Sequence, residues 1–170
     1  MVGSSLIKRL DNFLKRRNEP LPPTVRLNGQ SGLTLQGLRK LLEESLSRDG
    51  EGNIVLHVGA NDIGNLTEKN WILELEIHLR FLKMRYPKYK IFCSDMTPRS
   101  NWRGKIVGKM ETKRKRSNIR ARKLFFKLGD GVVHHPELQE NASLLHSDGI
   151  HFNNDGQISF WNDFKSFFLL

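Results

Sequence analysis

The sequence lacks several features on which whole classes of protein depend. It has a single cysteine, Cys93, which can form no disulfide within the chain and sits in an apolar run that predicts a buried core residue. No apolar run approaches the roughly 20 residues of a membrane-spanning helix. The first residues lack the basic and apolar regions of a secretory signal. Nothing therefore directs the chain to a membrane or to the outside, and an intracellular location is favoured.

Metal and nucleotide signatures are also missing. His134 and His135 precede Pro136 and lie near His146, but no carboxylate or cysteine completes a ligand set at a useful spacing. We interpret these histidines as part of a solvent-exposed loop. No glycine pattern that would cradle a phosphate is present either, which disfavours a flavodoxin-like ligand scaffold. We expect neither a metal nor a cofactor.

The chain does contain a regular alternation of short apolar strands and amphipathic helices. Its 170 residues suit one domain over residues 1–170, large enough to bury a core. Such an alternation predicts an α/β fold, with a parallel sheet covered on both faces. We expect helices at 6–14, 35–46, 71–82, 113–128 and 158–168, and strands at 24–27, 53–58, 90–94 and 131–133.

The motif Asp148-Gly149-Ile150-His151 offers an acid and a base in one loop. A histidine activates a serine hydroxyl when its other ring nitrogen is held by an acceptor, which Asp148 can provide. Ser5, at the start of the first predicted helix, is the candidate nucleophile. Ser5, Gly32, Asn61 and the Asp148 loop each follow a predicted strand. In a parallel sheet these positions share one edge, so we expect them to meet there.

Ester hydrolysis also needs donors for the oxyanion that develops in the transition state. The backbone N–H groups of Ser5 and Gly32 and the side-chain amide of Asn61 are the candidates. Glycine permits the close approach of backbone to substrate, and an asparagine amide donates at any working pH. These residues predict a serine esterase, with Ser5, Asp148 and His151 catalytic and with Ser5, Gly32 and Asn61 forming the oxyanion hole.

In order, these residues resemble the blocks of the SGNH hydrolases, also called the GDSL esterase and lipase family. The blocks are Gly3-Ser4-Ser5, the loop 28–32, Gly59-Ala60-Asn61-Asp62 and the segment 148–151. The resemblance implies a three-layer α/β/α sandwich with a flavodoxin-like strand order 2-1-3-4-5, acting on acyl esters without metal or nucleotide. A narrower likeness, around residues 95–99 and the basic helix that follows, is to esterase-like domains encoded by animal retrotransposons.

The chain departs from the family pattern in two places. Ser4 stands where the family usually has aspartate, a residue thought to support the turn. Only Met1 and Val2 precede Gly3, so the first strand is largely truncated. Strands are usually about five residues long. We therefore expect neighbouring strands to lack partners, apolar surface to be exposed, and the chain to be a fragment of a longer product that folds poorly alone.

The charge suggests an alternative function. The net charge is +10, and the segment 103–123 holds ten Lys or Arg against one acid, Glu111. Such a block can neutralise phosphates on RNA or on anionic lipid. In that alternative the chain is a catalytically silent module that binds polyanions through Lys113, Arg114, Lys115 and Arg116. The competing interpretation of the segment is a solvated helix face, because no aromatic residues are interleaved for base stacking.

Overall fold

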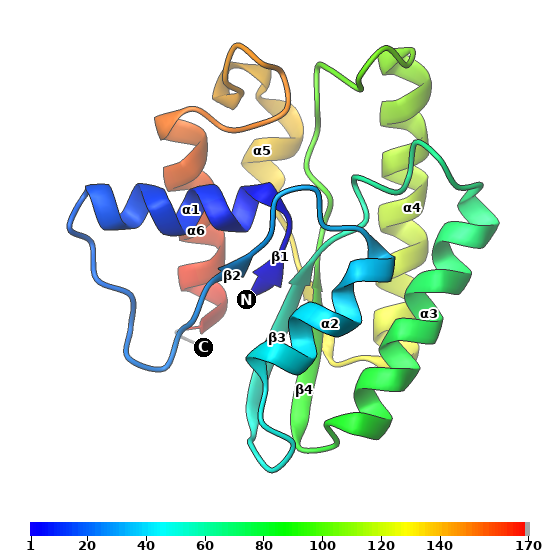
Figure 1. The fold of residues 1–170 in the computed structure, drawn as a ribbon. Coiled ribbons are helices and arrows are strands. Elements are labelled where there is room, and N and C mark those ends of the chain that lie inside the picture. Colours follow the sequence, from blue (N-terminus) through cyan, green and yellow to red (C-terminus); the bar gives the residue numbers. More distant parts are fainter. Residues whose placement is uncertain (169–170) are drawn as a thin grey trace.

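The structure, a computed structural model, describes residues 1–168 as alternating strands and helices (Figure 1). Among these residues no helix is both long and apolar enough to cross a membrane. In chain order the elements are β1 (Val2–Gly3), α1 (Ser5–Arg16), β2 (Asn28–Gly29), α2 (Leu35–Ser45), β3 (Gly52–His57), α3 (Glu68–Arg85), β4 (Tyr89–Ser94), α4 (Val107–Leu128), β5 (Gly131–Val133), α5 (Pro136–Glu140), a 3₁₀ turn at Ala142–Leu144 and α6 (Asn154–Phe168).

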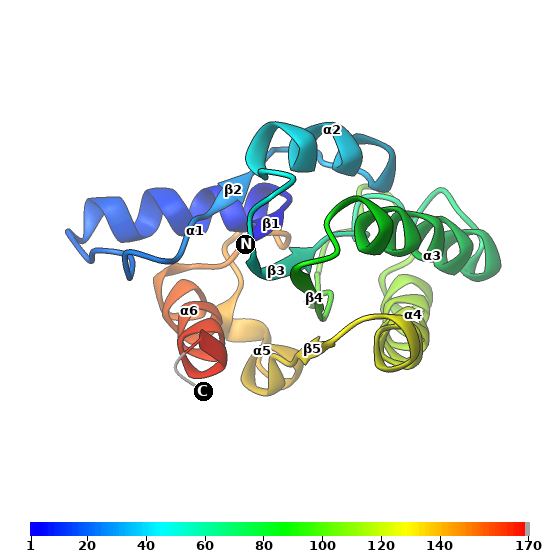
Figure 2. The ribbon, with the colours of Figure 1, turned by 90° about the horizontal axis from the view of Figure 1, so that it is seen from below.

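The five strands form one parallel sheet in the order β2-β1-β3-β4-β5, which confirms the predicted α/β/α sandwich. Side chains along β3 alternate between the faces. Ile54 and Leu56 join the core beneath α2, α3 and α4, whereas Val55 joins the core beneath α1 and α6. Seen along the sheet, α2 and α6 lie on opposite sides of the strands (Figure 2). The site therefore rests on a sheet whose strands share one carboxyl edge.

Strand β1 is only two residues long, and one of the two expected consequences follows at β3: part of this strand lacks a partner in β1, but its apolar side chains are not exposed. Val2 and Gly3 pair with both β2 and β3, and the amino-terminal half of β3 extends beyond them. Ile54 and Val55 are nevertheless 3% and 0% exposed, because helices pack over both faces of the sheet there. The exposed large apolar side chains instead lie on α3, α4 and the turn before α4, away from β1: Leu73, Ile77, Met84, Ile106, Val107, Ile119 and Phe126.

The edge strand differs from the prediction. The apolar run 24–27 is not a strand, and β2 is the following pair, Asn28–Gly29. An edge strand pairs only where its neighbour offers backbone groups, and β1 offers them at Val2 and Gly3. The Asn28 N–H extends this ladder by donating to the Met1 carbonyl at 2.8 Å. The register of β1 therefore sets β2.

Helix α4 begins at Val107, before the predicted start at residue 113, and its basic residues are not all on the outside. Arg114 is fully buried, with its Nε donating to Glu111 at 2.8 Å and its Nη1 donating to the Met96 carbonyl at 2.8 Å. Asn118, also buried, bonds both the N–H and the carbonyl of Met96. The inner face of α4 thus holds the segment that follows β4, and Arg114 is not part of a surface patch.

Candidate functional site

A sharp strand-to-helix turn presents Ser5. Ser4 is extended and its N–H donates to the His57 carbonyl on β3, after which α1 begins at Ser5. A Cβ atom on Gly3 would lie 2.5 Å from the Ile7 side chain and 2.7 Å from the His57 carbonyl oxygen. Glycine is therefore required for the chain to turn from sheet to helix at this point. The turn puts Ser5 at the helix amino terminus, where backbone N–H groups have no partner within the helix.

The loop Asp148–His151 brings the acid and the base to this serine. The His151 Nδ1 lies 2.7 Å from the Asp148 Oδ2, and its Nε2 lies 3.0 Å from the Ser5 Oγ. A carboxylate only accepts hydrogen bonds, so Nδ1 carries the proton and Nε2 is left to accept from the Ser5 hydroxyl. The structure therefore brings together the three side chains predicted to be catalytic.

The Asp148 carboxylate is held rigidly in its ionised form. Its Oδ1 accepts from the N–H groups of Ile150 and His151, each at 2.9 Å, and Arg9 lies 3.8 Å from its Oδ2. Burial raises the pKa of Asp148, but the bonds from the His151 backbone and ring and from Ile150 outweigh it and hold that pKa well below its usual range. The acceptor for His151 is thus charged and fixed at neutral pH.

Gly149 allows this loop to approach the segment after β4. Its φ is +67°, and a Cβ there would lie 2.4 Å from the Ser100 Oγ. The N–H groups of Ser100 and Asn101 both donate to the Gly149 carbonyl, at 2.9 and 3.1 Å. The prediction that this loop directly follows a strand is wrong, because α5 and a 3₁₀ turn lie between β5 and the loop. These bonds hold it at the sheet edge instead.

The two other oxyanion candidates lie on either side of β1. Gly32 follows β2 and Asn61 follows β3, the two strands that flank β1. The two loops are joined, because the Asn61 Nδ2 donates to the Leu33 carbonyl at 3.0 Å and keeps a second N–H on the same nitrogen. Gly32 has a φ of +73°, and no atom lies within 4 Å of the position its Cβ would take. Its backbone is therefore open to a ligand.

Asp62 supports the same pair of loops. Both of its carboxylate oxygens lie 3.2 Å from the Leu35 N–H at the start of α2. Burial raises the pKa of Asp62 to about 6, against smaller opposing contributions from the Leu35 bond. The ionised form is therefore less stable in the fold than in the unfolded chain, which makes the loop sensitive to pH.

We expect Asp62→Asn to become more stabilising as pH rises. Because the pKa of Asp62 is raised in the fold, the free energy of unfolding of the wild type is highest while Asp62 is protonated and falls as Asp62 ionises. The asparagine amide keeps an acceptor for the Leu35 N–H and never ionises. The free energy of unfolding of the variant minus that of the wild type should rise by about 1–3 kcal/mol between pH 4 and pH 7.5. Urea unfolding at the two pH values measures it, and a flat or falling difference contradicts it.

No protein-family profile matches the chain, and neither does any curated protein. Several solved structures are similar to it in fold. A Streptococcus pneumoniae protein described as a candidate platelet activating factor has a TM-score of 0.76 at 18% identity, covering 98% of this chain and 81% of its own. A GDSL-like lipase from Bacteroides thetaiotaomicron has a TM-score of 0.66 at 17% identity, covering 97% and 84%. The OSK domain of Drosophila Oskar has a TM-score of 0.70 at 15% identity, covering 97% and 85%.

The chain has the SGNH hydrolase fold. The four residue types for which the SGNH hydrolases are named occur here as Ser5, Gly32, Asn61 and His151, at the sheet edge described above. At Ser4, where the resemblance leads us to expect aspartate, the side chain forms no cap on α1. The turn is held instead by the Ser4 N–H bond to the His57 carbonyl.

Sequence reasoning missed Arg99, which lies beside Asn61. Arg99 is 5% exposed, and its Nη2 lies 3.5 Å from the Asn61 Oδ1. Its guanidinium stacks on Trp102, with 5.1 Å between the guanidinium carbon and the ring centroid. The Trp102 ring is buried and its N–H donates to Glu111, which fixes the ring on which Arg99 stacks. A lone arginine after a strand carries no signal of burial, because residues distant in the sequence, among them Asn61 and Glu111, lie against it.

The interpretation of the three histidines as solvent-exposed is wrong for His135 and holds for His134 and His146. His134 is half exposed and contacts Asp95, but His135 is fully buried. His135 lies in a chain of hydrogen bonds that runs Asp163, His135, Ser94 and His57, with separations of 2.8, 2.7 and 2.8 Å. These residue types match those of the surface site, but Ser94 is 1% exposed and inaccessible to substrate. Residues 1–168 contain no cluster of three side chains suited to a metal.

Proposed function

We propose that the protein is a serine esterase that hydrolyses acyl esters. The observation that carries the proposal is the pair of contacts at His151, 3.0 Å to the Ser5 Oγ and 2.7 Å to the Asp148 carboxylate. These lengths lie within the hydrogen-bond range expected between a nucleophile, its base and an orienting acid. The likeness in fold to GDSL-type enzymes supports the same chemistry.

In the first step the Ser5 Oγ attacks the ester carbonyl while its proton passes to the His151 Nε2. Asp148 stabilises the imidazolium that forms. The negative charge on the carbonyl oxygen is met by the N–H groups of Ser5 and Gly32 and by the Asn61 amide, aided by the amino terminus of α1. Collapse of this intermediate releases the alcohol, which takes the proton from His151.

In the second step water hydrolyses the acyl-enzyme. His151, now neutral, accepts a proton from the water as the water attacks the Ser5 ester, and the same oxyanion donors stabilise the second intermediate. Its collapse frees the acid and returns the proton to the Ser5 Oγ. The residues are thus regenerated, and no step requires a metal or a cofactor.

A fluorophosphonate probe tests the proposal independently of the natural substrate. Such a probe phosphonylates only a serine whose hydroxyl is activated by a base. We expect stoichiometric labelling of Ser5, located by peptide mass spectrometry, and loss of labelling in His151→Gln because the base is removed. Ser4 and Ser147 serve as internal controls, since neither contacts the His151 ring and neither should be labelled.

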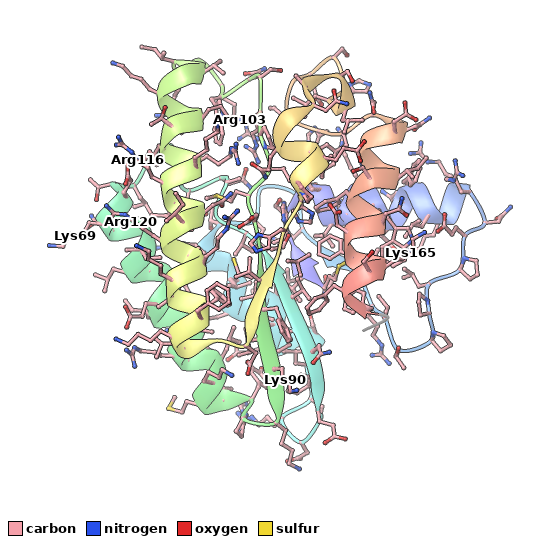
Figure 3. The ribbon with its side chains drawn as sticks, turned by 180° about the vertical axis from the view of Figure 1, so that it is seen from behind. Lys69, Lys90, Arg103, Arg116, Arg120 and Lys165 are labelled. Carbon is pink, nitrogen blue, oxygen red and sulfur yellow. The ribbon has the colours of Figure 1, made fainter. Side chains whose placement is uncertain are left out.

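The same experiment distinguishes the esterase from the alternative, a catalytically silent module that binds nucleic acid or anionic lipid. That alternative is supported by the cations that project outward from α4, among them Arg116 and Arg120 (Figure 3). Fewer cations are free to bind a polyanion than the sequence suggests, because Arg114 is buried. Arg116 and Arg120 both pair with Glu68, at 3.8 and 3.5 Å. A chain that is folded by circular dichroism but remains unlabelled at Ser5 would favour the binding module.

A further inference from the structure

A small cavity beside Asn61 carries positive charge without any acid. Its volume is about 200 Å³, and its lining includes Asn61, Trp102 and three cationic residues, Arg99, Arg103 and Lys105. No carboxylate is among the lining residues. Arg103 lies at the end of the molecule where α4 begins (Figure 3). A cavity lined in this way attracts anions and disfavours neutral apolar groups.

Arg99 is the cationic residue built most firmly into this cavity. Only 5% of Arg99 is exposed to solvent. Within the described residues its Nε has no hydrogen-bond acceptor. Burial lowers the pKa of Arg99 to about 10, which still leaves the guanidinium charged at neutral pH. A buried donor without an acceptor is costly, so its persistence at a cavity wall indicates that a ligand supplies the acceptor.

The three cations also lack the counter-charges that other arginines of this region have. Arg114 pairs with Glu111 and Arg122 with Asp95. None of the ion pairs formed within residues 1–168 involves the cationic residues of the cavity. Within residues 1–168 these cations therefore have no carboxylate in direct contact, although Glu111 and Asp148 act on Arg99 from a greater distance.

The cavity adjoins the reactive centre. Asn61, a candidate oxyanion donor, forms part of its wall, and Arg99 lies within 3.5 Å of the Asn61 Oδ1. The residues after Arg99 are bonded to the Gly149 carbonyl, in the loop that carries the acid and the base. An anion bound here would lie beside Asn61, the side chain proposed to contact the carbonyl oxygen of the ester.

We propose that this cavity binds an anionic oxygen group of the substrate, so that the enzyme prefers esters bearing a carboxylate or a phosphate near the scissile bond. The inference rests on the proposed esterase activity and names its substrate class. Guanidinium groups match the planar arrangement of carboxylate and phosphate oxygens, and Lys105 adds a point charge. Trp102 provides the apolar wall against which Arg99 is fixed.

Two pairs of esters that differ in charge test the proposal. One pair is 4-nitrophenyl valerate and mono-4-nitrophenyl glutarate, and the other is ethylene glycol monoacetate and 2-acetoxyethyl phosphate. The wild type should prefer at least one anionic ester by about tenfold or more in kcat/KM, as expected for a bond to a charged group. The preferred pair tells whether a carboxylate on the acyl part or a phosphate on the alcohol part is the source of the anion.

Lys105→Met should lower that preference about three- to tenfold, because it removes a charge at the cavity and keeps most of the stem. Lys109→Met is the matched control, since Lys109 is an exposed cation of α4 that does not line the cavity. It should leave the preference unchanged. Arg99→Met should abolish the preference for the anionic ester. If Arg99→Met does not fold, because Arg99 is buried, the result for Lys105→Met tests the proposal.

Binding without turnover separates this proposal from the esterase itself. Calorimetry of glutarate and of ethyl phosphate with the Ser5→Ala variant should show binding that Lys105→Met weakens and Lys109→Met does not. Binding in a chain without any Ser5-dependent hydrolysis would remove the esterase and keep the anion site. Ser5-dependent hydrolysis with neither anionic ester preferred, and with no anion binding, would overturn the anion site alone.

Discussion

Ser5→Ala is expected to lower kcat for 4-nitrophenyl butyrate by about four orders of magnitude or more, to the rate that oxyanion donors and binding alone support. Alanine removes the hydroxyl oxygen that lies 3.0 Å from the His151 Nε2. The fold should persist, because Ser5 is the first residue of α1 and alanine is a good helix former. Initial rates and circular dichroism of the same preparation measure both.

Ser4→Ala is the matched control for this substitution. Ser4 is the preceding residue, it is buried, and its side chain does not cap α1, so its loss removes no group that contacts His151. We expect Ser4→Ala to retain wild-type activity within about threefold. If Ser5→Ala kept more than a tenth of the wild-type rate, hydrolysis would not proceed through Ser5.

The parts of the fold that could be predicted are those with local signals. Apolar periodicity identified every long helix, because each buries one face in a regular pattern, and short apolar runs identified β3, β4 and β5. The loop from Asp148 to His151 could be predicted as an acid and base because both residues and the turn between them lie within four positions. Its relation to Ser5 followed from strand order, which the family resemblance implied.

The parts that could not be predicted are buried polar groups. The inner face of α4 includes Arg114, Ser117 and Asn118, all buried, so polar residues interrupt its apolar pattern between Met110 and Ala121. Such residues normally mark a solvated face, and here they satisfy the irregular backbone after β4 through Met96. A periodicity argument cannot distinguish a buried polar stripe from an exposed one.

The same limit hid Arg99 and His135. Each is buried by elements distant in sequence, Arg99 near the amino-terminal part of α4 and His135 against α6. His135 lies among aromatic rings, with Phe160 at 4.9 Å and Phe164 at 5.3 Å between ring centroids. A pair of histidines before a proline gives no sign that one faces solvent and the other the core. Both positions are determined by tertiary packing.

Asp148→Asn is expected to lower kcat by about ten-thousandfold while leaving the fold intact. The Asp148 Oδ1 accepts from two backbone N–H groups, those of Ile150 and His151, and these require an oxygen. The asparagine oxygen will occupy that position and its amide nitrogen will face the His151 Nδ1. An amide nitrogen only donates, so Nδ1 loses its proton, and Nε2 carries it toward Ser5. The histidine then cannot accept the proton of the serine hydroxyl.

A wrong tautomer and a damaged loop differ in their effect on the melting temperature. Asp148→Asn keeps both backbone bonds to the side-chain oxygen, so its melting temperature should stay close to that of the wild type, whereas Asp148→Ala loses these bonds and should melt earlier. Asp155→Asn, a nearby exposed carboxylate in the first turn of α6, controls for loss of charge and should keep full activity. Rates at saturating 4-nitrophenyl butyrate decide the question. A loss smaller than tenfold in Asp148→Asn would mean that His151 is oriented by some other group, and that the 2.7 Å contact has no part in the reaction.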